Sequence, residues 1–216
     1  MEPITLEQAR EYYVDADPAH DFDHVLRVLS LAERIGSAEG ADMVILRPAA
    51  LLHDIGRPEE LKEGRCHARV GAEKARRILS SWPASTVDAI AHAIAAHRYR
   101  DDLAPETLEA KVLFDADKLD CIGAIGVARA YVVGGLEGQR IWAEVDPERI
   151  QAMRLDKSLA RTNIAPDHTP VHEFAFKLAH IKDMLFTTTA KRIAEERHRF
   201  MGEFFLRLER EIKGEQ

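Results

Sequence analysis

The sequence predicts an all-α fold, and three observations lead to this prediction. Apolar residues recur at helical spacing in almost every segment, strand-like alternation is almost absent, and capping or breaking signals separate the periodic stretches. The chain has 216 residues, of which 46% are hydrophobic and 31% charged, so it contains enough apolar material for the core of one domain. We therefore expect a bundle of helices without internal repeats.

The N-terminal segment predicts two helices. Thr5 and Gln8 resemble a capping box, which opens a short helix. Asp17-Pro18 predicts the start of a second helix, because it combines an N-cap acceptor with proline at the first helical position. We expect Gly36 to end that helix. Its apolar residues repeat at i, i+3, i+4 and i+7 and are Val25, Val28, Leu29, Ala32 and Ile35.

The next segment, Ala41 to Asp54, is apolar on more than one face and predicts a buried central helix. Pro48 is expected to mark a kink or a new start within it. Gly56-Arg57-Pro58 is expected to end it. Glu59 to Arg65 is polar and contains one glycine, so we expect an exposed loop over the site, with its glutamates facing solvent.

The second half of the chain continues the helical pattern. Helices are expected over residues 67–80, 85–96 and 105–118. Residues 121–133 are small and apolar, which favours close helix packing, and Gly134-Gly135 is expected to break that helix.

The C-terminal third is less regular at first. Residues 134–170 are expected to form a lid or an insert with one short helix near 147–160. Val171 to Ile212 predicts two helices or one long bent helix. We treat 1–216 as a single domain, in which residues 171–216 pack on the core as C-terminal helices.

Charge and hydropathy exclude several classes of protein. The chain carries 30 Lys and Arg against 37 Asp and Glu, a formal charge of -7, so the basic footprint of a protein that binds a nucleic acid polymer is absent. An acidic protein that handles phosphates needs local positive charge from a metal or from clustered Arg and Lys. No stretch approaches the ~20 apolar residues of a membrane span. The first ten residues also lack the basic and apolar regions of a signal peptide.

The chain has two cysteines, Cys66 and Cys121, which lie far apart. A disulfide framework is therefore not expected, and a reducing cytoplasm is the predicted location.

Two histidines and two aspartates on separate predicted helices are candidates for one divalent-cation site. His24 lies early in its helix, His53 and Asp54 end the apolar helix, and Asp117 belongs to F-D-A-D-K-L-D at 114–120. Because His53 and Asp54 are adjacent, both reach one cation only where their helix ends. Burying them would be costly without a partner or a metal, although a lone histidine on an apolar helix is usually structural. These nitrogen and oxygen ligands suit Mn, Fe, Ni, Co, Zn or Mg and do not choose among them.

Other residues are candidates for contacts with a phosphate. His67 and His97 are candidates for phosphate donors or for ligands of a second metal, and His92 is a weaker one. Lys118 beside Asp117, and Arg57 soon after the His-Asp pair, are also candidates for phosphate contacts. The alternative for both cations is an ordinary solvated ion pair.

In this order and context, the residues resemble the HD-domain metal-dependent phosphohydrolases. The H…HD…D pattern is matched by His24, His53, Asp54 and Asp117, within D-x-x-H-x-x-R-V at 21–28, L-L-H-D-I-G at 51–56 and A-D-K-L-D at 116–120. D-A-D-K-L-D-C-I-G-A-I-G-V-A-R-A-Y at 115–131, and a tail from T-T-T-A-K-R-I-A-E-E-R to F-M-G-E-F-F, resemble a bacterial subgroup of small HD hydrolases. The resemblance covers roughly the whole chain.

The resemblance implies an all-α HD-domain bundle with a metal held between helices by His24, His53, Asp54 and Asp117. It also implies hydrolysis of phosphate esters or anhydrides, often in nucleotides. Some relatives of the subgroup cleave nucleoside triphosphates to monophosphate and pyrophosphate. Two branches fit less well. The first acid of the pair found in guanosine tetraphosphate hydrolases is replaced by Arg57, and R-Y-R-D-D follows His97 where cyclic dinucleotide phosphodiesterases have their own element.

We hypothesise a metal-dependent phosphohydrolase of a small nucleotide, with Asp54 as the catalytic residue that orients or deprotonates water. Arg57, Lys118, His67 and His97 would balance the charge of the phosphates. The alternatives are a two-metal phosphodiesterase, a non-catalytic metal- or nucleotide-binding module, and a purely structural helical protein. The oligomeric state is left open.

Overall fold

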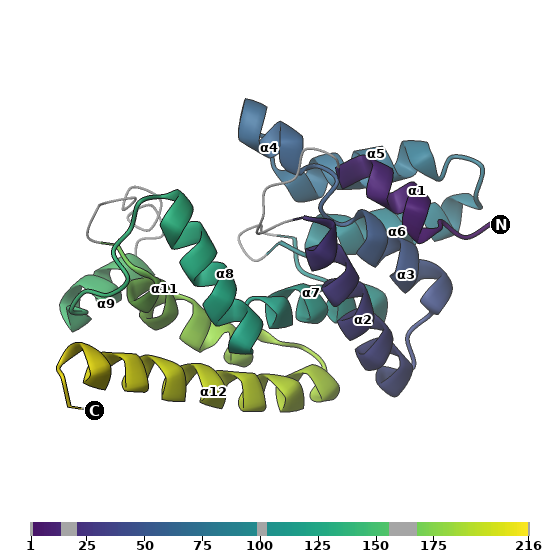
Figure 1. Ribbon diagram of the computed structural model, residues 1–216. Coiled ribbons are helices and arrows are strands. Elements are labelled where there is room, and N and C mark those ends of the chain that lie inside the picture. The colour runs from purple at the N-terminus through teal and green to yellow at the C-terminus, as the bar shows by residue number, and fades with distance from the viewer. Residues whose placement is uncertain (1, 14–20, 99–102, 156–167, 216) are drawn as a thin grey trace. The chain divides into compact units, whose positions relative to one another are not determined.

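A computed structural model describes residues 2–13, 21–98, 103–155 and 168–215 of the protein. All regular structure within these residues is helical, so the all-α prediction is confirmed (Figure 1). The predicted helix start at Asp17-Pro18 lies outside them.

The chain divides by its internal contacts into two compact units. The first unit contains residues 1–120 and 185–190, and the second contains residues 121–184 and 191–216. All candidate site residues belong to the first unit. The prediction of a single domain, with 134–170 as a lid or insert and 171–216 packed on the core, stays a prediction.

The helices of the first unit follow in chain order. They are α1 (Leu6–Arg10), the 3-10 helix η1 (Glu11–Tyr13), α2 (Phe22–Glu39), α3 (Met43–Leu52), α4 (Arg57–Glu63), α5 (His67–Ile78), α6 (Ala84–Ala96) and α7 (Leu108–Asp120). The capping box predicted at Thr5 and Gln8 is present at the start of α1. The helices expected over 67–80 and 85–96 are confirmed as α5 and α6, and the one expected from Pro105 begins later, as α7.

Helix α2 begins at the Asp21 cap, whose side chain accepts a hydrogen bond from the backbone N–H of His24 at 3.1 Å. The prediction that Gly36 ends this helix was wrong, because α2 continues to Glu39 and ends at Gly40. Gly40 has a φ of 83°, which favours glycine. A Cβ on Gly36 would collide with the side chain of Leu46, so Gly36 is required for packing against α3.

Helix α3 is buried, as expected, and it contains Pro48 without ending there. The segment predicted as an exposed loop is helix α4 instead. Pro58 stands in its first turn together with two glutamates, which suits the positive end of a helix dipole, and Gly64 ends it with a φ of 69°. The Gly-Arg-Pro run that ends the preceding segment is therefore also the start of the next helix.

The core of the first unit lies among α2, α3, α6 and α7. Contacts join α2 to α3 and α7, α3 to α6 and α7, and α6 to α5 and α7, as Figure 1 shows for these helices. Its largest fully buried side chains are Ile35, Leu46, Leu51, Leu52, Ile55, Leu79, Ile90, Ile94, Leu113 and Leu119. Burial of each contributes roughly 1.5–3 kcal/mol.

A buried carboxylate on α7 holds residues 185–190 in the first unit. Asp115 is fully buried, and it accepts hydrogen bonds from the backbone N–H groups of Phe186 at 2.9 Å and Thr187 at 2.7 Å. The Thr187 hydroxyl donates to the same carboxylate at 2.6 Å. The Glu39 side chain at the end of α2 also accepts from the Thr189 N–H at 2.7 Å. Segments far apart in the sequence are thus joined through two carboxylates.

The second unit contains α8 (Gly123–Leu136), α9 (Pro147–Leu155), α11 (Pro170–Phe176), the 3-10 helix η2 (Leu178–Met184) and most of α12 (Thr188–Ile212). Helix α11 contacts α8, α9 and η2. Residues 171–212, predicted as two helices or one long bent helix, contain α11 and α12 with the 3-10 helix η2 between them. The predicted break at Gly134-Gly135 was wrong, because α8 continues through both residues. A Cβ on Gly134 would lie 3.2 Å from Pro170 Cγ, so the glycine permits close packing instead.

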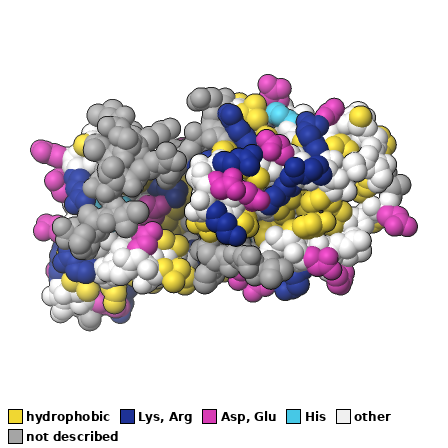
Figure 2. Space-filling model, turned by 90° about the horizontal axis from the view of Figure 1, so that it is seen from above, with side chains coloured by type: hydrophobic (Ala, Val, Ile, Leu, Met, Phe, Trp, Pro, Cys, Tyr) yellow, Lys and Arg dark blue, Asp and Glu magenta, His cyan; other side chains and the backbone are white. Residues whose placement is uncertain are grey.

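The surface is mixed in charge. On the face in Figure 2, basic and acidic side chains are interspersed. Ion pairs such as Lys74–Glu59, at 2.6 Å, join charges of opposite sign. Among the described residues, no single helix has the length and hydropathy of a membrane span. The bent pair of α7 and α8 has that length and hydropathy only when the two helices are counted together.

We expect Asp115→Ala to lower the free energy of unfolding by roughly 2–4 kcal/mol, because it removes the acceptor of the part-buried N–H of residue 186 and of the buried N–H and hydroxyl of Thr187. Urea unfolding followed by circular dichroism measures this change. The control is Asp88→Ala, which removes an exposed ion pair with Arg76 and should cost less than about 1 kcal/mol. Equal effects of the two substitutions would contradict the structural role of Asp115.

Candidate metal centre

The four predicted metal ligands come together at one place in the first unit. His24 stands in the first turn of α2, directly after its Asp21 cap. His53 is the C-terminal cap of α3, and Asp54 lies in the turn that follows it. Asp117 is in the last turn of α7. Because α3 ends at this point, the adjacent His53 and Asp54 both face the same centre, as expected from the sequence.

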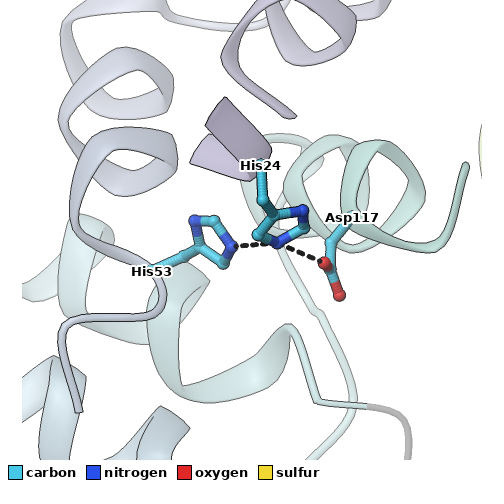
Figure 3. A group of neighbouring side chains, drawn as sticks. All are labelled: His24, His53 and Asp117. Carbon is cyan, nitrogen blue, oxygen red and sulfur yellow. Dashed lines mark hydrogen bonds and ion pairs between the residues drawn. The ribbon is translucent and has the colours of Figure 1, made fainter. Parts of the chain in front are cut away.

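His24 lies between two of the other candidate ligands (Figure 3). Its Nε2 is 3.2 Å from the Nε2 of His53 and 3.4 Å from the Oδ1 of Asp117. One donor atom from each of these three buried side chains lies within 4.8 Å of the others, a spacing that would suit one metal ion. Three ligand atoms therefore converge from three different helices.

Asp54 connects this group to a second one. Its Oδ2 is 3.7 Å from the Nε2 of both His24 and His53. Its Oδ1 lies 3.4 Å from the Nε2 of His67 and 3.5 Å from the Nε2 of His97, and these three residues also have metal-ligand spacing. The structure thus brings His67 and His97 to the site, whereas the Nε2 of His92 accepts from the backbone N–H of residue 106 in an exposed position.

Two of the imidazoles are oriented by their own helices. His53 Nδ1 donates to the carbonyl of Ala50 at 2.8 Å, and His97 Nδ1 donates to the carbonyl of Ile94 at 2.6 Å. A carbonyl oxygen only accepts hydrogen bonds, so Nδ1 carries the proton in both rings. The Nε2 lone pair of each ring is then available at the centre.

The other two imidazoles are oriented by carboxylates. His24 Nδ1 lies 2.7 Å from Asp120 Oδ2, and His67 Nδ1 lies 2.7 Å from Glu60 Oε2. All four rings therefore have their Nδ1 bonded outward and their Nε2 directed inward. This is the arrangement that metal-binding histidines usually adopt.

Burial makes the centre suitable for a cation. Asp54 is only 1% exposed, and neither of its oxygens has a hydrogen-bond donor among the residues that the structure describes. Arg57 Nε is 3.1 Å from Asp54 Oδ1, but the geometry is that of an ion pair without a hydrogen bond. A buried carboxylate without donors is costly unless a positive charge faces it. The nitrogen and oxygen donors around Asp54 fit a divalent metal ion.

The protonation states also favour a cation. Burial alone would raise the pKa of Asp54, but the Arg57 guanidinium holds it well below its ordinary value. Burial has the same tendency at Asp117, where the Lys118 ammonium and His24 hold the carboxyl pKa well below its ordinary value. Burial lowers the pKa of His53 to about 3, so its ring is neutral at neutral pH. Charged oxygens and a neutral nitrogen are the forms that bind a metal.

Comparison with known proteins agrees with this geometry. The family profile of the HD domain matches residues 21–122, which include every histidine and carboxylate of the centre. The uncharacterized protein YpgQ of Bacillus subtilis is 34% identical over 214 residues, covering 93% of this chain and 88% of YpgQ. The chain belongs to the HD-domain family.

Solved structures of HD-domain relatives share the fold. Bacillus subtilis YpgQ in complex with ADP has a TM-score of 0.73 at 31% identity, covering 97% of this chain and 99% of YpgQ. A protein described as a predicted HD superfamily hydrolase, from an uncultured Thermotogales bacterium, has a TM-score of 0.65 at 32% identity, covering 95% of this chain and 90% of its own. Ribonuclease Y of Chloroflexus aurantiacus is 41% identical over 96 residues, which are 44% of this chain and 17% of the ribonuclease. The protein is an HD-superfamily hydrolase of the metal-dependent type.

The two predicted phosphate-binding cations stand beside the carboxylates of the HD centre. Arg57 contacts Asp54 and also pairs with Glu60 at 3.0 Å. Lys118 Nζ donates to Asp117 Oδ2 at 2.6 Å. Both cations therefore lie beside candidate metal ligands, and their contact with a phosphate stays a prediction.

Sequence reasoning missed some functional neighbours of the HD centre. Glu60, expected to face solvent, instead bonds His67 and is paired with Arg98 at 3.0 Å. Asp120 and Arg27 were not predicted as site residues, although each follows a predicted ligand by three residues. Spacing by three places residues on one helical face, so this signal was present in the sequence.

We expect Mn²⁺ to raise the melting temperature of the metal-free HD protein. Binding at a concentration of 100 times Kd stabilises the folded state by about 2.7 kcal/mol. Asp54→Asn should lose most of this increase, because it removes the charge that faces the cation. Scanning calorimetry with and without Mn²⁺ measures the shift, and Asp88→Asn provides a surface control. An undiminished increase in Asp54→Asn would argue against a metal at this centre.

Proposed function

We propose that the protein is a metal-dependent phosphohydrolase that acts on a nucleotide, cleaving a nucleoside triphosphate to the monophosphate and pyrophosphate. The observation that carries the proposal is the buried Asp54 carboxylate, which is faced by the Nε2 atoms of four imidazoles and has no hydrogen-bond donor in the described part of the chain. The complex of Bacillus subtilis YpgQ with ADP supports a nucleotide as the ligand, because that protein aligns with 97% of this chain.

His24, His53, Asp54 and Asp117 would hold the metal. When bound, a divalent cation polarises a phosphoryl oxygen and increases the acidity of water. Asp54 presents Oδ2 to His24 and His53 and leaves Oδ1 on the opposite side, toward His67 and His97. One oxygen can therefore serve the metal while the other orients the attacking water and accepts its proton.

The bonds made and broken in the proposed reaction are as follows. The water oxygen attacks the α-phosphorus, the bond from that phosphorus to the bridging oxygen breaks, and pyrophosphate leaves with the bridging oxygen. Arg57, Lys118, His67 and His97 are proposed to offset the negative charge of the phosphates. The substrate is proposed to be a small molecule and not a nucleic acid polymer, because the formal charge of the chain is -7.

Product analysis tests the proposed reaction. The Mn²⁺-loaded protein, offered ribo- and deoxynucleoside mono-, di- and triphosphates, is expected to release pyrophosphate and monophosphate from triphosphates. Asp54→Ala should lower the rate by about 10²-fold or more, because the water loses its orienting group. Chromatography resolves the products, and circular dichroism checks that the variant is folded.

Other results would replace this proposal. Free phosphate from monophosphates would identify a nucleotidase. Tight nucleotide binding without turnover would favour a non-catalytic binding module. Turnover that survives in folded Asp54→Ala would exclude the proposed mechanism.

A two-metal phosphodiesterase is the second candidate, and the division of Asp54 between two groups of histidines favours it. Asp54 with His67 and His97 has metal-ligand spacing of its own, separate from the group formed by His24, His53 and Asp117. In that case Asp54 would belong to both ligand groups, and a second ion would further stabilise the charge of the phosphate.

Counting metal ions separates the two candidates. Elemental analysis after gel filtration in Mn²⁺ should give close to one ion per chain for the proposed pyrophosphohydrolase and close to two for the phosphodiesterase. His67→Ala should leave the count at one in the first case. A fall from two to one in that variant would favour the second candidate.

A further inference from the structure

Asp120 and Arg27 form a buried support behind His24, on the side away from the centre. Asp120 is 1% exposed, and its Oδ2 is 2.7 Å from His24 Nδ1. Arg27 donates to both oxygens of the same carboxylate, from Nε to Oδ1 at 2.8 Å and from a terminal nitrogen to Oδ2 at 3.1 Å. Figure 3 shows that the Nε2 edge of the His24 ring faces His53 and Asp117. The carboxylate of Asp120 therefore bonds the nitrogen that is not directed at the centre.

We propose that Asp120, clamped by Arg27, is a positioning residue that fixes His24 in the tautomer required for metal binding. This role rests on the metal function proposed for His24. An ionised carboxylate only accepts hydrogen bonds, and the Asp120 oxygen at 2.7 Å from Nδ1 is closer than the Asp117 oxygen at 3.4 Å from Nε2, so the proton of a neutral His24 ring is favoured on Nδ1. The lone pair is then on Nε2, which lies 3.2 Å from His53 Nε2 and 3.4 Å from Asp117 Oδ1.

Helix geometry explains why one pair of helices supplies the whole arrangement. His24 and Arg27 are three residues apart on α2, and Asp117 and Asp120 are three residues apart on α7. Residues with this spacing lie on one face of a helix, and α2 and α7 contact each other. The His24 ring is thus held between two carboxylates of α7, one at each ring nitrogen.

His24 depends on this support more than its neighbour His53 does. The Nδ1 of His53 bonds the carbonyl of Ala50 on its own helix, at 2.8 Å, so its tautomer follows from the local backbone. His24 has a carboxylate from a helix 96 residues away in the sequence. A change at position 120 therefore alters one imidazole of the pair and leaves the other as an internal reference.

The substitution Asp120→Asn directly tests the proposed role of Asp120 in positioning His24. The natural carboxylate accepts from the Nδ1–H of His24 and from two N–H groups of Arg27. An asparagine amide has one acceptor oxygen and an NH₂ group that only donates. In either orientation the NH₂ group meets an N–H of Arg27, and in one orientation it also favours the wrong tautomer of His24.

Calorimetric titration of the metal-free full-length protein with Mn²⁺ tests the proposal. We expect Asp120→Asn to bind Mn²⁺ about 10- to 100-fold more weakly than the natural protein. Arg27→Gln, which alters a side chain that is 34% exposed and should fold normally, should weaken binding in the same direction by a smaller factor. Asp115→Asn is the matched control, because Asp115 is also buried on α7 but bonds residues 186 and 187.

A second measurement needs neither metal nor turnover. Nitrogen-15 spectra of the histidine rings in the metal-free protein, at a pH where His24 is neutral, report the tautomer of each ring. We expect an Nδ1–H ring at His24 in the natural protein and a changed His24 signal in Asp120→Asn. The His53 signal should be unchanged.

The outcomes are distinguishable. Metal affinity in folded Asp120→Asn and Arg27→Gln equal to that of the natural protein, with an unchanged His24 signal, would overturn the role of Asp120 alone. Equal losses of affinity in Asp120→Asn and Asp115→Asn would also overturn it, since destabilisation would then explain both. A natural protein that binds no Mn²⁺ would overturn the proposed function and this role with it.

Discussion

The arrangement of the first unit depends on one buried charge. This charge is the Asp54 carboxylate, which lies among imidazoles in an apolar core. Asp54 follows the very apolar α3, and both of its oxygens are buried with no hydrogen-bond donor from any residue that the structure describes. Water cannot compensate its charge there, so compensation has to come from neighbouring cations or from a bound one. The surrounding histidines satisfy their Nδ1 atoms on other groups and keep their Nε2 lone pairs for the centre. The apolar core therefore keeps water away from the centre, and the side chains around the centre have to supply the compensation that water would give.

The sequence predicted the residues of the centre better than their supports, for a physical reason. His53 and Asp54 are recognisable because local signals end their helix where two adjacent side chains can face one point. The bond between His24 and Asp120 spans 96 residues, and no local pattern specifies which helices will pack together. Glu60 was expected to face solvent for a related reason, since its partner His67 belongs to a different helix. Supports of this kind depend on tertiary pairing.

The predicted helix ends that were wrong concern residue types that can have opposite effects on a helix. Glycine ends helices, and it also lets helices approach closely. Gly36 and Gly134 were expected to break helices, but both lie within them, where a Cβ would crowd Leu46 or Pro170. Proline likewise ends one helix or begins the next, and Pro58 begins α4. Periodicity, which reflects burial directly, placed α5 and α6 within a few residues. The choice between two uses of one residue requires knowledge of what packs against it.

The balance of charge around the centre suits a polyanionic substrate. Among the described residues, each carboxylate near the histidines has a cationic neighbour, so these fixed charges cancel while the imidazoles are neutral. A divalent metal then makes the centre positive by two charges, in a buried setting where screening is weak. A phosphate chain would be attracted to this charge, and a neutral ligand would not. The attraction favours phosphates over other hydrolysable groups. The cancelling charges belong to four pairs: Asp54 with Arg57, Asp117 with Lys118, Asp120 with Arg27, and Glu60 with Arg98.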